Sequence, residues 1–162
     1  MAWTTPTTVN AGDKLTSTLW NNEVVGNLNY LLSPNKAVVI HNNGSDYTTT
    51  STTFVDVDAT NLSLTITTHG GPVLVVAVCK AMNGNGFGAG GLDITMDGTR
   101  IGANTTLGLA DVGNVYMSYS LVALVSPSAG SHTFRLQFKA VAGTTTLYSN
   151  AALPVVMAAI EL

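Results

Sequence analysis

The chain has 162 residues and a formal net charge of −3, and only 9% of its residues are charged while 46% are hydrophobic. A typical soluble domain carries about 25% charged residues. The six basic residues are scattered along the sequence, which together with the negative net charge argues against nucleic acid as a partner, because phosphate binding needs a basic patch. Because charge is depleted where protein surfaces form interface cores, this composition favours part of an assembly over a free monomer.

Residues 1–33 form the first predicted segment, an extended threonine-rich arm followed by a helical pattern. The arm has no basic stretch followed by an apolar run, so we expect no secretory signal and synthesis in a cytoplasm. A four-four-three apolar spacing predicts a helix with one apolar side, capped by Thr16 or Ser17 and ended by Ser33-Pro34. Its other side is rich in asparagine, so this helix needs a partner surface. We therefore predict that the segment attaches to another protein through Trp20, Val24, Leu28 and Leu31.

From residue 36 to residue 162, short apolar runs are separated by turn residues, which is typical of an all-β domain. The clearest hairpin signal is Asp97-Gly98, which lies between two such runs. The predicted strands are Ala37–His41, Thr53–Asp58, Asn61–Thr68, Pro72–Met82, Leu92–Met96, Thr99–Ile101, Val115–Val125, Ser131–Ala140, Thr144–Tyr148 and Pro154–Leu162.

Two kinds of strand occur in this segment. Three runs, of which Phe134–Phe138 is one, place an apolar residue at every second position and so have one wet face. The runs Pro72–Met82, Val115–Val125 and Pro154–Leu162 are apolar on both faces, whereas a two-sheet sandwich covers only one face of each sheet. We expect other copies of the chain to cover the second face. The predicted interface residues are Val73, Val75, Tyr116, Val122, Val155 and Met157.

The order of these strands resembles the jelly roll of the complement C1q and tumour-necrosis-factor family. That family places the first, a middle, a later and the last strand in an inner sheet around a threefold axis. The runs that are apolar on both faces here fall fourth, about seventh and last. The resemblance covers residues 36–162 and implies a jelly-roll β-sandwich head that forms a homotrimer.

A second resemblance is local. The segment Ala11–Thr16, followed by Leu19-Trp20-Asn21 and Asn27–Leu31, is similar to a short N-terminal module of virion proteins of tailed bacteriophages, and the run Gly130–Leu136 and the ending Ala158–Leu162 are similar to phage tail and fibre head domains. Together these resemblances imply a non-enzymatic structural protein on the virion surface. It would be a knob that decorates the capsid or tail, or a short tail fibre. The alternative is the receptor-binding tip of a tail fibre that recognises host-surface carbohydrate.

A glycine-rich segment, residues 84–91, contains a G-x-G-x-x-G match at Gly86, Gly88 and Gly91. A dinucleotide site requires a helix directly after such a match, and the residues that follow alternate as a strand instead. We therefore expect an exposed loop between strands. Asn85 and Phe87 are its candidate contacts for a glycan or a neighbouring subunit.

No pattern in the sequence predicts catalysis, a metal or a cofactor. Asp56 and Asp58, and likewise Asp93 and Asp97, share a strand face, which suits calcium or glycoside hydrolysis but equally a solvated surface. The three histidines lack metal-site spacing, although one histidine from each subunit could meet on a threefold axis. Cys79 lies within an apolar run and is expected to be buried. No apolar run is long enough for a membrane helix.

Overall fold

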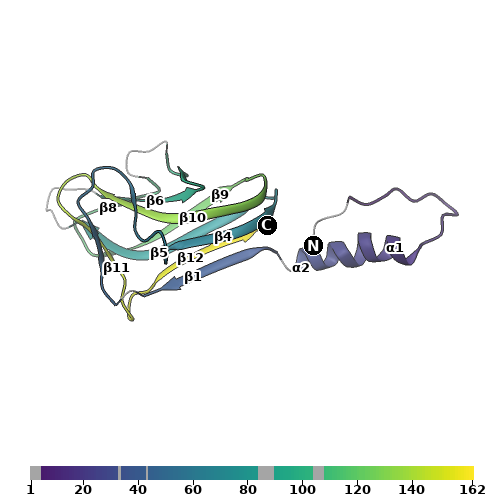
Figure 1. The fold of residues 1–162 in the computed structure, drawn as a ribbon, viewed down its shortest axis with the longest axis horizontal. Helices are drawn as coiled ribbons and strands as arrows, with labels where there is room; N and C mark the ends of the chain where they lie inside the picture. Colours follow the sequence, from purple (N-terminus) through teal and green to yellow (C-terminus); the bar gives the residue numbers. More distant parts are fainter. Residues whose placement is uncertain (1–4, 33, 43, 84–89, 104–107) are drawn as a thin grey trace. The chain divides into compact units, whose positions relative to one another are not determined.

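The computed structural model describes residues 5–32, 34–42, 44–83, 90–103 and 108–162, apart from the side chains of Tyr30, Leu32, Met82 and Asn83. The chain divides into two units, Met1–Asn35 and Lys36–Leu162. Figure 1 shows a helix and an arm in the first unit and a β-sandwich in the second.

The N-terminal unit contains one continuous helix made of α1 (Ser17–Leu19), the π-helical turn η1 (Trp20–Val25) and α2 (Gly26–Leu32). The Thr16 hydroxyl accepts a hydrogen bond from the Leu19 amide at 3.1 Å, so the predicted N-cap is confirmed. The predicted helix is also present, but the π-helical turn was not foreseen. In the arm, the Asn10 amide donates to the Asp13 carboxylate at 2.7 Å, which closes a turn that carries Gly12 at a φ of 97°.

The described part of the second unit forms only β-strands. They are β1 (Lys36–His41), β2 (Tyr47–Thr49), β3 (Val55–Asp56), β4 (Ser63–His69), β5 (Val73–Asn83), β6 (Gly90–Met96), β7 (Thr99–Arg100), β8 (Ala110–Val112), β9 (Met117–Val125), β10 (Ala129–Ala140), β11 (Thr145–Tyr148) and β12 (Val155–Glu161). All ten predicted strands are present, whereas β2 and β8 were missed. Asp97 and Gly98 connect β6 to β7 with φ values of 52° and 82°, as the predicted two-residue hairpin requires.

The strands form two antiparallel sheets. Sheet A has the order β1-β12-β5-β11-β2 with β9 also paired to β5, and sheet B has the order β3-β10-β6-β7 with β4 paired to β10 and β8 to β6. Taken in chain order, β1, β4, β5, β6, β8, β9, β10 and β12 pair first with last, second with seventh, third with sixth and fourth with fifth. This nested pairing is a jelly roll, so the predicted fold is confirmed.

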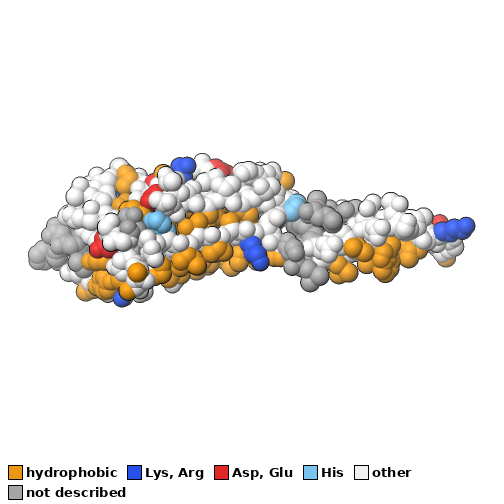
Figure 2. Space-filling model, turned by 60° about the horizontal axis from the view of Figure 1, so that its bottom comes forward, with side chains coloured by type: hydrophobic (Ala, Val, Ile, Leu, Met, Phe, Trp, Pro, Cys, Tyr) orange, Lys and Arg blue, Asp and Glu red, His pale blue; other side chains and the backbone are white. Residues whose placement is uncertain are grey.

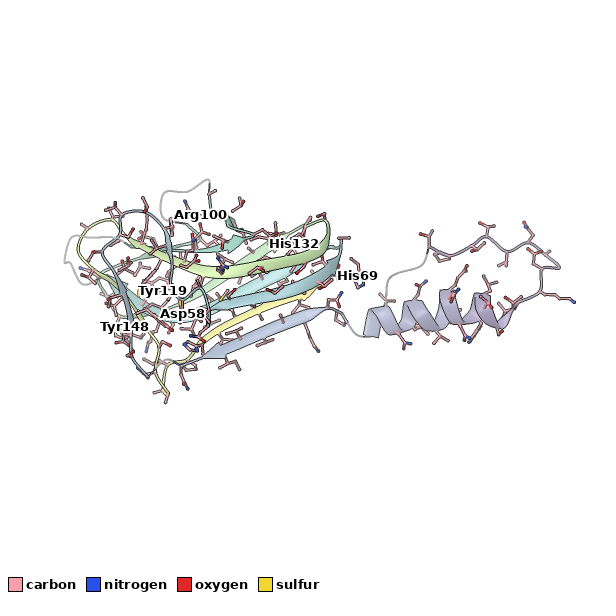
Figure 3. All side chains as sticks on the ribbon, in the orientation of Figure 1. Asp58, His69, Arg100, Tyr119, His132 and Tyr148 are labelled. Carbon is pink, nitrogen blue, oxygen red and sulfur yellow. The ribbon has the colours of Figure 1, made fainter. Side chains whose placement is uncertain are left out.

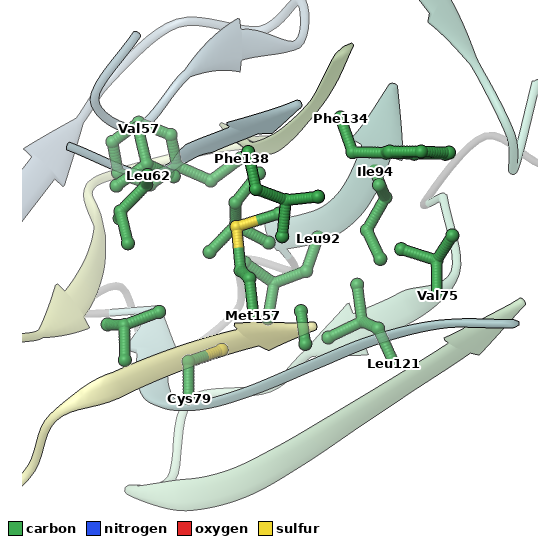
Figure 4. Packing of buried hydrophobic residues seen from close by; sticks show 14 of the residues in the cluster. Val57, Leu62, Val75, Cys79, Leu92, Ile94, Leu121, Phe134, Phe138 and Met157 are labelled. Atoms are coloured by element: carbon green, nitrogen blue, oxygen red, sulfur yellow. The ribbon is translucent and has the colours of Figure 1, made fainter. Parts of the chain in front are cut away.

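The two kinds of strand separate cleanly between the sheets. The strands that alternate in sequence, β4, β6 and β10, lie in sheet B, and the strands that are apolar on both faces, β5, β9 and β12, lie in sheet A. The core lies between the sheets, where Phe134 and Leu136 of sheet B pack with residues such as Val75 and Met157 of sheet A, all of them fully buried (Figure 4). One face of each sheet thus packs in the core, and the opposite face points outward.

Candidate functional site

The outward face of sheet A carries apolar side chains across four neighbouring strands. Because the register is known, these side chains can be read as rows that cross β1, β12, β5 and β9 in turn. The rows are Lys36–Ile160–Leu74–Leu124, Val38–Ala158–Val76–Val122 and Ile40–Val156–Val78–Ser120. Only Lys36 and Ser120 interrupt them, and both lie in strands at the margins of this surface. We call this surface the A face.

The A face is open to solvent in the structure. Its outer strands are the most exposed, with Ile40 at 70%, Leu124 at 62% and Val122 at 58% of their full accessibility, while the side chains of β12 are half-buried. Figure 2 shows these hydrophobic side chains gathered along the lower side of the head. Contiguous exposed apolar surface of this kind marks a binding surface, because single exposed apolar residues are common but continuous rows of them are not.

Four of the six predicted interface residues are wrong. Val73, Val75, Val155 and Met157 are completely buried and point into the core between the sheets, so they cannot touch another copy. Side chains alternate between the two faces of a strand, and in a strand that is apolar on both faces the sequence does not say which set points inward. The outward residues are their neighbours, among them Leu74, Val76, Val156 and Ile160. The other two predicted residues, Tyr116 and Val122, are exposed, at 43% and 58%.

A small aromatic cluster lies beyond the third of these rows, where Lys80 follows Val78 on the same face of β5. The ring of Tyr116 meets that of Tyr148 edge-on at 4.4 Å, and the Lys80 ammonium lies 4.3 Å from the centre of the Tyr116 ring. Burial, with a smaller contribution from Asp46, raises the pKa of Tyr148. Aromatic rings with a cation above them are typical of residues that anchor interfaces, so this cluster extends the A face.

The predicted attachment residues of the N-terminal unit are also largely exposed. Trp20, Leu28 and Leu31 are 48%, 52% and 62% exposed, and Val24 is half-buried. Within this helix, burial falls on Gly26 and Asn27 instead. The helix therefore keeps an apolar side that its own unit does not cover.

The outward face of sheet B is polar and is largely occupied by internal hydrogen bonds. The Asp56 carboxylate accepts from Gln137 at 2.7 Å and from Arg135 at 3.3 Å. Asp93 is completely buried, and accepts from Arg100 and from the amides of Ile94 and Gly102 at 2.7 to 2.9 Å. Phe54 covers this pair, with its ring 3.8 Å from the Arg100 guanidinium.

The carboxylates of Asp58 and Asp97 and the histidine rings also have partners within the chain (Figure 3). Asp58 accepts hydrogen bonds from Asn61, Thr60 and Tyr47, which hold its pKa well below the usual range, and Asn61 contributes most. His132 lies 2.6 Å from Asp97, and His41 lies 2.9 Å from the Tyr47 hydroxyl. Among the residues that the structure describes, no three histidine, cysteine, aspartate or glutamate side chains form a group that could hold a metal ion. Each of the four paired carboxylates accepts hydrogen bonds from neighbouring groups of the chain.

The glycine-rich segment is described only at its end. Gly90 and Gly91 belong to strand β6, so no helix follows the glycine match and the dinucleotide alternative is wrong. Asn85 and Phe87 lie outside the described residues, and their contact with a glycan stays a prediction. Cys79 is 3% exposed, which confirms the prediction that it is buried, and burial raises the pKa of its thiol to about 12.

Sequence reasoning missed the burial of two carboxylates, those of Glu161 and Asp93. Glu161 was included in an apolar strand, but its carboxylate is buried at the end of β12 and accepts hydrogen bonds from the amides of His69 and Gly71 at 2.6 and 3.1 Å. It thereby ties the turn between β4 and β5 to the last strand. The only signal was a single charge in a run that is otherwise apolar. Asp93 was assigned to a wet face, and nothing in its own strand indicated that Phe54 and Arg100 would cover it.

Comparison with known proteins adds two distant structural neighbours. No family model matches the chain, and no curated protein sequence matches it. Among solved structures, Eiger TNF from S. frugiperda is similar at 13% identity and a TM-score of 0.46, over 80% of this chain and 94% of that one. Dimeric latent PorU from Porphyromonas gingivalis is similar at 12% identity and a TM-score of 0.43, over 99% of this chain and 14% of that one. The jelly-roll assignment rests on the strand order described above. Within the described ranges, no helix has the length and apolar character needed to cross a membrane.

Proposed function

We propose that this chain is a non-enzymatic structural protein of a tailed-phage virion. In this proposal Lys36–Leu162 form a homotrimeric knob on the virion surface and Met1–Asn35 attaches the knob to another virion protein. The knob decorates the capsid or tail or ends a short fibre. The protein is made in the host cytoplasm and needs no cofactor.

The observation that carries the proposal is the A face. The three rows of the A face are uncharged except for Lys36 in the outer strand β1, so they offer little charge that would repel another copy of the same surface. Burying apolar surface stabilises an assembly by about 25 cal/mol per Å², so an obligate interface of a few thousand Å² offsets the entropy lost on association. The number of copies, three, comes from the resemblance to the complement C1q and tumour-necrosis-factor family. The virion comes from the resemblance of the N-terminal segment to phage modules.

The quaternary part is tested by light scattering during size-exclusion chromatography of the full chain. The expected mass is three times the 16.7 kDa of one chain. A folded monomer at micromolar concentration would overturn the trimer, because the rows of the A face would then be stable in water.

The virion part is tested separately by immunogold labelling of intact phage particles with antibodies against the knob. Labelling of a defined position on the capsid or tail is expected. A trimer that is absent from purified particles would reject the virion assignment and leave the assembly intact. Adsorption of the isolated knob to host cells would favour the receptor-binding alternative over pure decoration.

A further inference from the structure

The helix of the N-terminal unit exposes a stripe of apolar side chains, and the proposed role of the A face does not account for this stripe. Trp20, Val25, Leu28 and Leu31 are between 39% and 62% exposed, although they come from a helix of only sixteen residues, Ser17–Leu32. Figure 2 shows hydrophobic side chains along one side of this helix. We call these four residues the helix stripe.

The sequence of this helix has a low intrinsic propensity to form a helix in water. Glycine and asparagine are poor helix formers, and the helix contains Gly26 and four asparagines between residues 21 and 29. Helices of about 12 to 15 residues are marginal in water even with favourable sequences. Glu23 is the one charged residue of the segment 17–32, so ion pairs along the helix do not compensate. The helix stripe therefore requires a partner surface.

The chain itself indicates what that partner is. Only three residues, Ser33 to Asn35, separate the helix from β1, and three residues span at most about 10 Å. Strand β1 belongs to sheet A and contributes Val38 and Ile40 to the A face, which is the proposed trimer interface. Trimer formation would therefore bring three helix ends within a short distance of one another. Short connections of this kind give effective concentrations in the millimolar range.

The composition of the helix stripe fits contact between identical helices. Its side chains are all uncharged, so parallel copies do not repel one another. Three of its members, Trp20, Leu28 and Leu31, form a four-four-three spacing together with the half-buried Val24, close to the average of 3.5 residues at which apolar side chains meet along a coiled coil. The stripe spans barely two heptads, which is too short to assemble helices that are not already held together.

We propose that the three helices of one trimer pack against each other through the helix stripe as a short parallel bundle. This inference rests on the proposed trimer and changes one part of the expected attachment. The helix residues are used between copies of the chain, and the contact with another virion protein falls on the exposed arm, residues 5–15.

The test is disulfide cross-linking of the full-length protein with a single introduced cysteine. Cys79 is buried and has a pKa of about 12, so it does not interfere. The variant Leu28→Cys places a thiol on the helix stripe, and Asn29→Cys places one on the adjacent exposed residue outside it. We expect Leu28→Cys to oxidise to a covalent dimer at least tenfold faster than Asn29→Cys. The rate should not depend on protein concentration, because the cross-link forms within one trimer. No more than two of every three chains should be linked, because each chain carries one introduced thiol.

The outcomes separate the two proposals. A protein that is trimeric by light scattering but in which both variants cross-link equally slowly would overturn the helix bundle and leave the trimer standing. If both variants cross-link equally slowly and a thiol reagent labels Leu28→Cys faster on free trimers than on intact particles, another virion protein covers the helix stripe instead. A monomer would overturn both proposals. A second stripe variant, Leu31→Cys, guards against a purely local effect, and it is expected to match Leu28→Cys.

Discussion

The two outward faces of the sandwich differ although the same core lies beneath them. The outward rows of sheet B read Ser63–Arg135–Thr95 and Asp56–Gln137–Asp93, and those of sheet A consist almost entirely of valine, leucine, isoleucine and alanine. The polar groups on the outer face of sheet B form internal hydrogen bonds, and Phe54 and Arg100 cover part of this face. Among the residues that the structure describes in the second unit, none covers the outer strands of sheet A in this way, and Ile40, Val122 and Leu124 stay exposed. The difference teaches that the outward side chains of sheet A, unlike those of sheet B, have the character of a surface that another protein covers, as the proposed trimer requires.

The largest effect is expected from adjacent residues of β9 that point to opposite sides of sheet A. Leu121 is 1% exposed and Val122 is 58% exposed. Leu121→Asp would bury an unpaired charge in the core, which costs several kcal/mol and should unfold the protomer. Val122→Asp should leave the protomer folded and abolish the trimer. Circular dichroism with thermal melting reports the first outcome and light scattering the second.

The variants Leu121→Asp and Val122→Asp can also contradict the prediction. If Val122→Asp remains trimeric, the A face is not the interface, whatever the effect of Leu121→Asp. If both variants lose their β-sheet signal, the protomer depends on the assembly for its own stability, which is the behaviour of an obligate oligomer.

A smaller effect is expected where sheet B is covered by its own chain. Asp93→Ala would leave the Arg100 guanidinium and two backbone amides without the carboxylate that they bind, and the unsatisfied groups should lower the free energy of unfolding by about 2 to 4 kcal/mol. Chemical denaturation measures this change. The oligomeric state should not change, because Asp93 lies on the sheet opposite the A face.

How much of this could be predicted follows from the period of the strands. Alternation in β4, β6 and β10 correctly placed their apolar residues in the core, because a strand with one wet face has a unique way to sit on a core. In β5 and β12 the same rule has two solutions, and the wrong one was chosen for Val73 and Met157. A neighbouring strand with clear alternation does not remove this ambiguity, since the register between strands is absent from the sequence.

The missed elements are short or depend on tertiary contacts. Strands β2 and β8 have three residues each, too few to show a period, and they form only because longer strands, β11 and β6, offer free edges. The burial of Asp93 and Glu161 depends on partners distant in the chain, such as Arg100 and the amide of Gly71. Local patterns predicted the polarity of sheet B, but such distant contacts decided which polar residues of the two sheets are buried.

A modest effect on trimer stability is expected when an apolar residue of the A face is made polar, and none when a polar residue on the outward face of sheet B is made apolar. Ile40→Thr removes an apolar side chain from the A face, where Ile40 is 70% exposed in one protomer, and should weaken the trimer by about 1 kcal/mol per chain. Thr65→Ile adds an apolar side chain to the outward face of sheet B and should leave assembly unchanged, with only its hydrogen bond to Thr133 lost. Dilution followed by mass photometry compares the two variants. Equal dissociation would mean that the faces do not differ in role.

The smallest effect concerns the ion pair between His132 and Asp97 at the end of sheet B, whose protonation changes with pH. His132 lies between two acceptors, the Asp97 carboxylate at 2.6 Å and the Ser128 carbonyl at 2.9 Å, so the doubly protonated ring satisfies both. The Asp97 hydrogen bond, followed by that to Ser128, raises the pKa of His132, and hydrogen bonds from Thr133 and His132 lower the pKa of Asp97.

The signs of these two shifts define a pH window. A raised histidine pKa stabilises the fold fully below its unfolded value of about 6.5 and ceases to do so as the pH rises through the folded value, while a lowered aspartate pKa stabilises above about 3.9 and is lost in stronger acid. His132→Ala should therefore reduce the unfolding free energy most near pH 5 to 6, by no more than about 1 kcal/mol because the pair is partly exposed, and less at pH 9. Asp97→Asn, which keeps an acceptor for the Thr133 amide, should remove the same pH dependence. Loss of stability that is equal at pH 5.5 and pH 9 would assign His132 a packing role only, and the trimer mass should be the same at both pH values.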